Sequence, residues 1–528
     1  MARGGNLTEL AEMIGEGLAI APAPPELSAL GRMMATQGLT GELARAMFAE
    51  AGAKRPKTRR IDGLLFLFGE AADELRLSGN GGNVSAQREL AAVLNLVGHE
   101  AAKGRAGPGM LMALTRTLKF AGLEPPPQVQ HAMGAAMAAE GPSGNPRLSE
   151  ARVHAQLDDM AEQFGGDPFL MHQEIAAMAA AFPADKQPAV VMSLFEHANP
   201  VVRAAGLGFV LSAEATLAKV ALAACAEASE RETPDQQTLS RLVMMRPWLG
   251  VETRAVADPV IAHLRKQAPE PLAAVAPKVD RCFATPCDGA GVQSISALVK
   301  QGRKWALASV LIKAEAGVAD AWAAKGMTKR QADGLAARLM EEAAAELTTM
   351  AFASQRLGDA LARHAAAAPP PFGLVQVCEL LGLGIVAPNA VAPETLIAEL
   401  LNGLPAEQTG PLAQQRAHEE SIRWADMTGV TDTWFEAGAE VEALLKPIRG
   451  RAKREAAVLQ HLLPGRRDYW LQQLAWTAAA LKPKAGKDPT WIEMALVGRA
   501  LIDAADIADV PFVQVIAIDT VRAFEGRG

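Results

Sequence analysis

The chain has 528 residues and a formal net charge of −7, from 52 basic and 59 acidic side chains. Half of its residues are hydrophobic although only 5% are aromatic, and this supply of apolar side chains excludes a mostly disordered chain. The negative net charge argues against a protein that coats nucleic acid along its whole surface.

Helical periodicity dominates the segments between breaks rich in proline and glycine. Because alanine is the strongest helix former and strand-like alternation is scarce, we expect a nearly all-α protein of stacked helix pairs, with less regular helical blocks at both ends. The clearest helices are Ser85–Leu96, Leu148–Phe164, Gln331–Leu347 and Ala452–Leu463. The breaks predict an N-terminal helical block (1–140), a block of helical repeats (141–278), a middle helical block (279–368) and a C-terminal helical block (369–528).

Two basic clusters are candidate binding sites for an anionic partner. The first precedes an apolar run and consists of Lys54, Arg55, Lys57, Arg59 and Arg60. The second precedes Trp470 and Trp476 and includes Arg449, Arg451, Lys453, Arg454, Arg466 and Arg467. Cations interleaved with aromatic residues can contact phosphates and stack on bases. The plainer interpretation is solvated turns in which arginines neutralise helix C-termini and the tryptophans face the core.

Asx-Pro dipeptides mark the starts of several predicted helices. In each, the Asx side chain can cap free backbone N–H groups and proline fits the first turn, where its missing N–H costs nothing. The third dipeptide, Asn199-Pro200, is followed by an apolar face that includes Val202 and Phe209 at helical spacing. The five dipeptides are Asn145-Pro146, Asp167-Pro168, Asn199-Pro200, Asp258-Pro259 and Asp488-Pro489.

The segment Phe169–Ser229 contains two predicted helix pairs: Met171–Phe182 with Pro188–His197, and Pro200–Leu211 with Ala213–Ser229. The pattern Asn199-Pro200-x-Val202-Arg203-x-Ala205 resembles the start of a HEAT repeat, although Asn199 stands where the consensus has an acidic residue. The resemblance implies an α-solenoid scaffold that offers a concave surface to partners. It also implies that Arg203 pairs with an acidic side chain of a neighbouring repeat.

Cysteine usage and hydropathy predict a soluble, cytoplasmic, bacterial-type protein. The four cysteines, Cys225, Cys282, Cys287 and Cys378, are too few to crosslink a chain of this length, so we expect reduced thiols. Cys282 and Cys287 lack the spacing of a zinc site, and we expect neither a metal nor a cofactor. The apolar stretch Phe372–Ala387 has 16 residues between prolines, which is too short for a membrane span and predicts a buried segment.

Motifs for catalysis are absent from the sequence: there is no phosphate-binding loop, HExxH, nucleophile elbow or paired CxxC. Titratable residues gather around His418, Glu420 and Asp426, where they form either a solvated helix face or part of a site assembled from distant helices. We therefore expect a non-catalytic scaffold or adaptor that binds another macromolecule, most readily a protein. The alternative is a HEAT-like protein that binds nucleic acid through the two basic clusters and acts on bases or phosphates.

Overall fold

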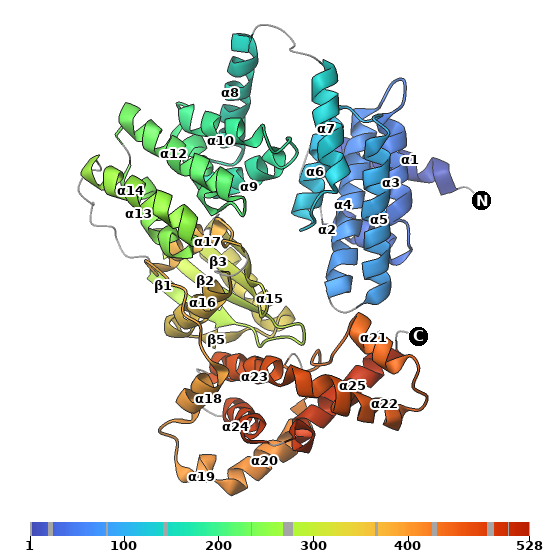
Figure 1. Cartoon of the computed structure of the whole chain (residues 1–528), viewed down its shortest axis with the longest axis vertical. Coiled ribbons are helices and arrows are strands. Elements are labelled where there is room, and N and C mark those ends of the chain that lie inside the picture. Colours follow the sequence, from blue (N-terminus) through green and yellow to red (C-terminus); the bar gives the residue numbers. More distant parts are fainter. Residues whose placement is uncertain are drawn as a thin grey trace. The chain divides into compact units, whose positions relative to one another are not determined.

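A computed structural model describes residues 3–18, 25–80, 83–140, 146–233, 235–267, 278–364, 368–424, 430–482, 490–504 and 506–526 (Figure 1). Most of these residues are helical, as the composition predicts. The chain divides into two compact units: unit 1 extends to Val210 and adds Ala223–Ala228, and unit 2 comprises Leu211–Leu222 and the chain from Ser229 onward. Within the ranges given, no helix has the length and hydropathy needed to cross a bilayer.

Unit 1 is helical throughout its described residues, and α4 lies at the centre of its N-terminal part. The apolar face of α4 includes Leu64, Leu67 and Phe68, which are wholly buried, and α4 contacts α1, α2, α3, α5 and α6. The helices are α1 (Arg3–Leu18), α2 (Pro25–Thr36), α3 (Thr40–Ala51), α4 (Thr58–Asn80), α5 (Val84–Ala102), α6 (Pro108–Phe120), α7 (Pro127–Glu140), α8 (Pro146–Gln163), α9 (Pro168–Ala179), α10 (Gln187–Glu196) and α11 (Pro200–Gly206), followed by the 3₁₀ turn η1 (Leu207–Leu211). The next helix, α12 (Ala215–Arg231), is divided between the two units, and Ala223–Ala228 is its part in unit 1.

Two glycines allow α1 and α4 to pack with their backbones almost in contact. A Cβ atom added to Gly15 would lie 1.7 Å from the carbonyl oxygen of Arg59, and one added to Gly63 would lie 1.9 Å from that of Ala11. No side chain fits in such a gap, so glycine is required at both positions. This close approach positions the N-terminal half of α4.

Two of the predicted helix caps are confirmed. The Asp167 carboxylate accepts hydrogen bonds from the N–H groups of Phe169 and Leu170, and the Asn199 side-chain oxygen accepts one from Val201. The prediction for Asp258-Pro259 is wrong, because both residues lie inside α14 (Val251–Gln267). The Asp258 carboxylate instead binds the Arg246 guanidinium. Asn145 and Asp488 lie outside the described residues.

The helices predicted for the HEAT-like segment all form, as α9 to α12. Val202 is wholly buried and Phe209 is 5% exposed, so this face packs inward as expected. The guanidinium of Arg203 donates to the carbonyl oxygens of His197 and Ala198, just beyond the end of α10, where basic groups are favourable. The stacking of these helices as HEAT repeats stays a prediction.

Unit 2 combines helices with an antiparallel sheet. Its elements after α12 are α13 (Gln236–Met245), η2 (Arg246–Trp248), α14, β1 (Lys278–Ala284), β2 (Val292–Gln301), β3 (Lys304–Lys313), β4 (Gly317–Met327), α15 (Lys329–Glu342), β5 (Glu346–Thr348), α16 (Met350–His364), α17 (Gly373–Leu381), α18 (Pro393–Leu401), α19 (Ala406–Thr409), α20 (Pro411–Ser421), α21 (Ala439–Leu445), α22 (Arg451–Ala457), the π turn η4 (Val458–Leu462), the 3₁₀ turn η5 (Leu463–Arg466), α23 (Arg467–Leu481), α24 (Thr490–Asp503), η7 (Ile507–Asp509) and α25 (Pro511–Glu525).

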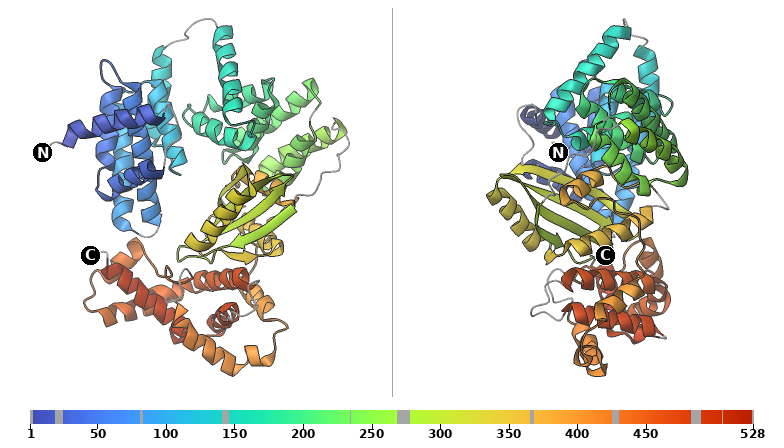
Figure 2. Two further views of the ribbon diagram at one scale, coloured as in Figure 1. Left: turned by 180° about the vertical axis from the view of Figure 1, so that it is seen from behind. Right: turned by 90° about the vertical axis from the view of Figure 1, so that its left-hand side faces the viewer.

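The sheet corrects the prediction of a nearly all-α chain and of a helical block at 279–368. Its strands follow the order β4-β3-β2-β1-β5, and Figure 2 shows them in yellow and yellow-green. Six successive residues of β3, 305–310, are buried, so both faces of the strand are covered. Trp305 and Leu307 pack against Ala332 of α15 on one of these faces. Burial on both faces removes the apolar–polar alternation by which a strand is recognised in a sequence. Without that alternation, the Ala- and Leu-rich sequence of β3 has the composition of a buried helix.

A buried polar network connects the strands of unit 2 to its helices. The Arg356 guanidinium, 1% exposed, donates to Gln293 Oε1 of β2 at 2.8 Å and to Asp359 Oδ2 at 2.7 Å. It also stacks on the Trp476 ring of α23, 4.6 Å from the ring centroid. The Asp359 carboxylate also accepts hydrogen bonds from Arg363 and from the Val391 N–H. Because Arg356, Gln293 and Asp359 are all buried, losing one of these side chains leaves a buried polar or charged group with too few hydrogen bonds.

The tryptophans of the C-terminal block belong to the core, as the plainer interpretation of their distribution predicts. Trp424, Trp434 and Trp470 surround Phe512 of α25, with ring centroids 5.5–6.5 Å from the Phe512 ring. All three are at most 2% exposed. The prediction that the apolar segment Phe372–Ala387 is buried is confirmed for α17, in which eight of the nine residues are buried. The end of the segment is more open, since Ile385 is 58% exposed.

We predict that burial of His172 makes the stability of unit 1 depend on pH. Its Nδ1 lies 2.9 Å from the Ala205 carbonyl oxygen and its ring packs on Phe209, and loss of hydration lowers the His172 pKa from 6.5 to about 4. The unfolded chain therefore binds the proton more readily than the folded chain between these values. Stability should be full above pH 6.5, fall as the pH decreases toward about 4, and then level off.

His172→Gln keeps a donor for the Ala205 carbonyl but does not titrate in this range. The melting temperature, followed by circular dichroism, should fall more steeply between pH 6.5 and 4 for the wild type than for this variant. Parallel pH profiles for the two proteins would contradict the assignment.

We predict that removing Arg356 destabilises unit 2 by about 3 kcal/mol, because Asp359 then stays buried without its main partner. All eight tryptophans belong to unit 2, so tryptophan fluorescence during urea unfolding reports on this unit. Replacing both charges, in Arg356→Met with Asp359→Leu, should cost clearly less than the two single changes together. Additive losses would show that the two side chains do not act as a pair.

Candidate functional site

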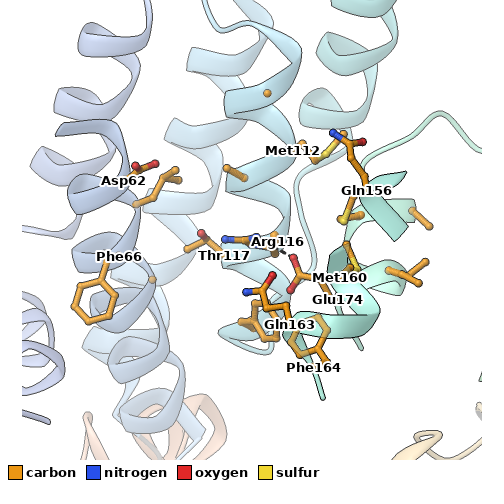
Figure 3. Close-up of a pocket in the computed structure, with 18 of the residues that line it drawn as sticks. Asp62, Phe66, Met112, Arg116, Thr117, Gln156, Met160, Gln163, Phe164 and Glu174 are labelled. Atoms are coloured by element: carbon orange, nitrogen blue, oxygen red, sulfur yellow. Dashed lines mark hydrogen bonds and ion pairs between the residues drawn. The ribbon is translucent and has the colours of Figure 1, made fainter. Parts of the chain in front are cut away.

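A pocket of about 1370 Å³ lies within unit 1, between the faces of six helices. Helix α4 lines it with Asp62, Phe66 and Glu70, at the four-residue spacing of one helical face. The corresponding faces of α6 and α8 contribute residues at intervals of three and four, and α1, α9 and α10 complete the wall. Figure 3 shows α4 on one side of this space and α8 on the other.

The lining of the pocket is mainly apolar and rich in flexible side chains. Met112, Met160 and Met178 line it from α6, α8 and α9, together with four phenylalanines: Phe66, Phe120, Phe164 and Phe182. Phe120 at the end of α6 is 61% exposed, and Val153 on α8 is 44% exposed. Large apolar side chains that remain open to water around a concave surface are a mark of a binding site.

An ion pair crosses the pocket and connects α6 with α9. Arg116 NH1 lies 2.8 Å from Glu174 Oε1 (Figure 3). The Glu174 side chain is only 10% exposed, whereas that of Arg116 is 53% exposed. The buried carboxylate therefore depends on Arg116 for compensation of its charge.

The remaining charges give the pocket a negative character. Its lining contains five carboxylates and two guanidiniums. Arg59 forms an ion pair with Asp62 at 3.5 Å, and Asp73 binds Arg76 outside the lining at 2.5 Å. Within the part of the chain that the structure describes, Glu70 on α4 and Asp159 on α8 have no ion-pair partner. Two opposite walls therefore each carry one uncompensated carboxylate.

The first basic cluster lies in the turn before α4 and at the start of that helix, and acidic side chains of unit 1 neutralise part of it. Lys57 Nζ binds Glu12 at 2.7 Å, and Arg60 binds both Glu12 and Glu50, at 2.6 and 2.9 Å. These contacts hold the pKa of Glu12 below its usual value, since the hydrogen bonds from Lys57 and Arg60 favour its charged form. Lys54 and Arg55 are exposed. The cluster thus fastens α4 to α1 and α3.

The second basic cluster lies along α22, η5 and the start of α23. Arg451 and Arg454 form ion pairs with Glu455 and Glu525 at 2.9 and 2.8 Å. Arg466 binds Glu436 at 2.9 Å. The exposed cations of this cluster include Arg449 and Lys453, whereas Arg467 is half-buried. Trp470 donates its Nε1–H to Glu436 and Trp476 is buried, so neither ring faces a ligand as base stacking would require.

The titratable residues predicted to gather around His418 do not form a common site in the part of the chain that the structure describes. His418 Nε2 lies 2.9 Å from Gln414 Nε2, and partial burial lowers the His418 pKa. Glu420 lies 3.7 Å from Arg423 in a separate surface ion pair. Asp426 lies outside the described residues.

The four cysteines are buried, and the described residues contain no disulfide bond between them. Burial raises the pKa of Cys282 to about 12 and that of Cys287 to about 11, so both remain protonated at neutral pH. The described residues contain no group of three or more His, Cys, Asp or Glu side chains placed to hold a metal ion.

Sequence reasoning missed the unit 1 pocket almost completely. Of the predicted site residues only Arg59 lines it, and it was assigned to an anionic partner. One signal was present: α6 carries Met112, Ala113 and Phe120 at helical spacing on the face that lines the pocket, and Phe120 is 61% exposed. A large apolar side chain left exposed on such a face indicates a surface that something else covers.

Comparison with known proteins identifies related domains and a related protein, but none of them has a described activity. Residues 183–268 match the family model of the Y4lR second domain, and residues 394–525 match that of the Y4lR C-terminal helical domain. The chain is similar to the uncharacterized protein y4lR of Sinorhizobium fredii (strain NBRC 101917 / NGR234). The identity is 25% over 385 residues, which cover 71% of this chain and 72% of that protein. No solved structure matches at a significant level.

Proposed function

We propose that this protein is a non-catalytic scaffold or adaptor that binds a protein partner in the pocket of unit 1. The observation that carries the proposal is the combination of a volume of about 1370 Å³ with a lining of exposed apolar side chains. Pockets for small molecules usually measure about 300–1000 Å³ and enclose most of their ligand. A larger groove formed by helix faces suits a segment of polypeptide.

The lining chemistry supports a protein partner. Methionine side chains are unbranched and polarisable, and they adapt to the shape of an apolar partner surface. Phe120, exposed at the rim, has the size and position of an aromatic side chain that contributes much of the binding energy at an interface.

The alternative proposal, binding of nucleic acid through the basic clusters, has less support. Lys57, Arg60, Arg454 and Arg466 already contact carboxylates, so a phosphate would have to compete with these ion pairs. The pocket itself carries an excess of carboxylates and would repel a polyphosphate.

Two further expectations belong to this proposal. Helices α9 to α12 would act as HEAT-like repeats that carry one side of the groove, a role supported by the caps at Asp167 and Asn199. We also propose a location in the cytoplasm, for which the support is that the four cysteines are buried and form no disulfide bond among the described residues.

We predict that Phe120→Ala weakens retention of the partner at least about fivefold, as expected for an interface anchor. The full chain, immobilised as wild type or variant, is exposed to native lysate and the bound proteins are quantified by mass spectrometry. Leu77→Ala is the matched control, because Leu77 is an α4 side chain that is 50% exposed and does not line the pocket.

A partner of the groove should be retained by the wild type and by Leu77→Ala but not by Phe120→Ala. If all three proteins retain the same set of proteins equally, or if the wild type retains none, the proposal is wrong. Equal melting temperatures for the three proteins ensure that the comparison concerns binding.

A further inference from the structure

We propose that the groove of unit 1 recognises a positively charged, amphipathic α-helix of the partner. This inference rests on the proposed function and adds the chemical class of the ligand. It follows from three properties of the lining: the length of the helix faces that form it, the kind of apolar side chains they present, and the position of the carboxylates that lack an ion-pair partner.

The shape of the groove suits a helix. The lining residues extend along α4 from Arg59 to Asp73 and along α6 from Gly109 to Phe120. At a rise of 1.5 Å per residue these walls are about 16–21 Å long, which matches a helix of roughly 11 to 14 residues. Residues that project at intervals of three and four form ridges, and a further helix can insert its own ridges between them.

The apolar lining suits the hydrophobic stripe of such a helix. Met112, Met160 and Met178 come from three different helices and so reach the occupant from several directions. A groove with flexible methionines and phenylalanines can accept Leu, Ile or Phe at positions i, i+3, i+4 and i+7 of an amphipathic helix.

The charge of the groove selects a basic helix. Arg116 and Arg59 are occupied by Glu174 and Asp62, so they are not free to attract an anion. Glu70 and Asp159, in contrast, have no ion-pair partner among the described residues. Lysine or arginine side chains flanking an apolar stripe would meet one carboxylate on the α4 wall and one on the α8 wall. An acidic helix, a nucleic acid or an anionic lipid surface would be repelled.

The test measures binding of synthetic peptides to the full chain. The probe is a fluorescent peptide of about 14 residues with leucines along one face and lysines along the other. A second peptide carries glutamates in place of the lysines, and a third has the composition of the first in an order that destroys the apolar face. Fluorescence anisotropy gives each Kd at low and at moderate salt.

Two protein variants remove the same amount of charge. The groove variant is Glu70→Gln with Asp159→Asn. The control variant is Glu74→Gln with Glu162→Gln, which changes carboxylates of the same two helices that do not line the pocket. The lysine peptide should bind the wild type at least about tenfold more tightly than either other peptide. The groove variant should bind it roughly fivefold less tightly and with a weaker salt dependence, whereas the control should change by less than about twofold.

Equal binding of the lysine and glutamate peptides, or equal losses in the groove and control variants, would overturn the inference. Failure of the inference is distinguishable from failure of the proposed function. If a protein from the lysate is retained in a Phe120-dependent manner while the lysine peptide is not preferred, the groove binds a partner of different chemistry. If no Phe120-dependent partner is retained, the proposed function itself is wrong.

Discussion

The ion pair between Arg116 and Glu174 is the contact on which the candidate site most depends. It connects α6, in the N-terminal part of unit 1, to α9, and it lies inside the pocket. Because the Glu174 carboxylate is almost fully buried, losing its contact with Arg116 would leave a buried charge without a partner, which is strongly destabilising. A second contact, from Gln130 of α7 to the Ala180 carbonyl at the end of α9, acts in the same direction. Together these bonds hold α9 against α6 and α7 and so fix the position of the pocket wall that α9 forms.

Unit 2 is built on a different principle, in which polar groups are buried inside its core. Arg356 links β2 to α16 and stacks on Trp476 of α23, while the tryptophans around Phe512 fill the C-terminal helices. The Cys287 backbone also belongs to this network, since its N–H donates to Thr477 and its carbonyl accepts from Trp434. These groups are buried and have partners. Their arrangement therefore accounts for stability and a unique packing of the unit more directly than for binding.

Local features of the fold could be predicted from the sequence, whereas features assembled from distant residues could not. The caps at Asp167 and Asn199 depend on residues two or three positions away, and both predictions are confirmed. The cap predicted at Asp258 is wrong because α14 already begins at Val251, and the Asp258 carboxylate binds Arg246, twelve residues earlier. The sheet was missed because strand β3 is buried on both faces and so lacks alternation.

The candidate site was beyond single-sequence reasoning for the same reason. Its lining begins at Gly15 and ends at Leu194, and what joins Arg116 to Glu174 is the packing of α6 on α9. The basic residues that looked available in the sequence are partly neutralised by remote carboxylates, as Lys57 is by Glu12. Charge patterns along a chain do not show which ion pairs the fold will form. The apolar residues Met112 and Phe120 on one face of α6 were visible in the sequence, but their meaning depended on knowing which helices lie opposite them.

The central claim is that helix faces of unit 1 form a groove for a basic amphipathic helix, and methionine methyl NMR tests it most directly. Among the 20 methionines, Met112, Met160 and Met178 line the groove, whereas Met13 and Met33 are exposed residues outside it. With ¹³C-methyl-methionine and assignment by single Met→Leu substitutions, the lysine peptide should shift the three groove resonances and leave those of Met13 and Met33 in place. Shifts confined to methionines outside the groove, or none at all at saturating peptide, would contradict the account.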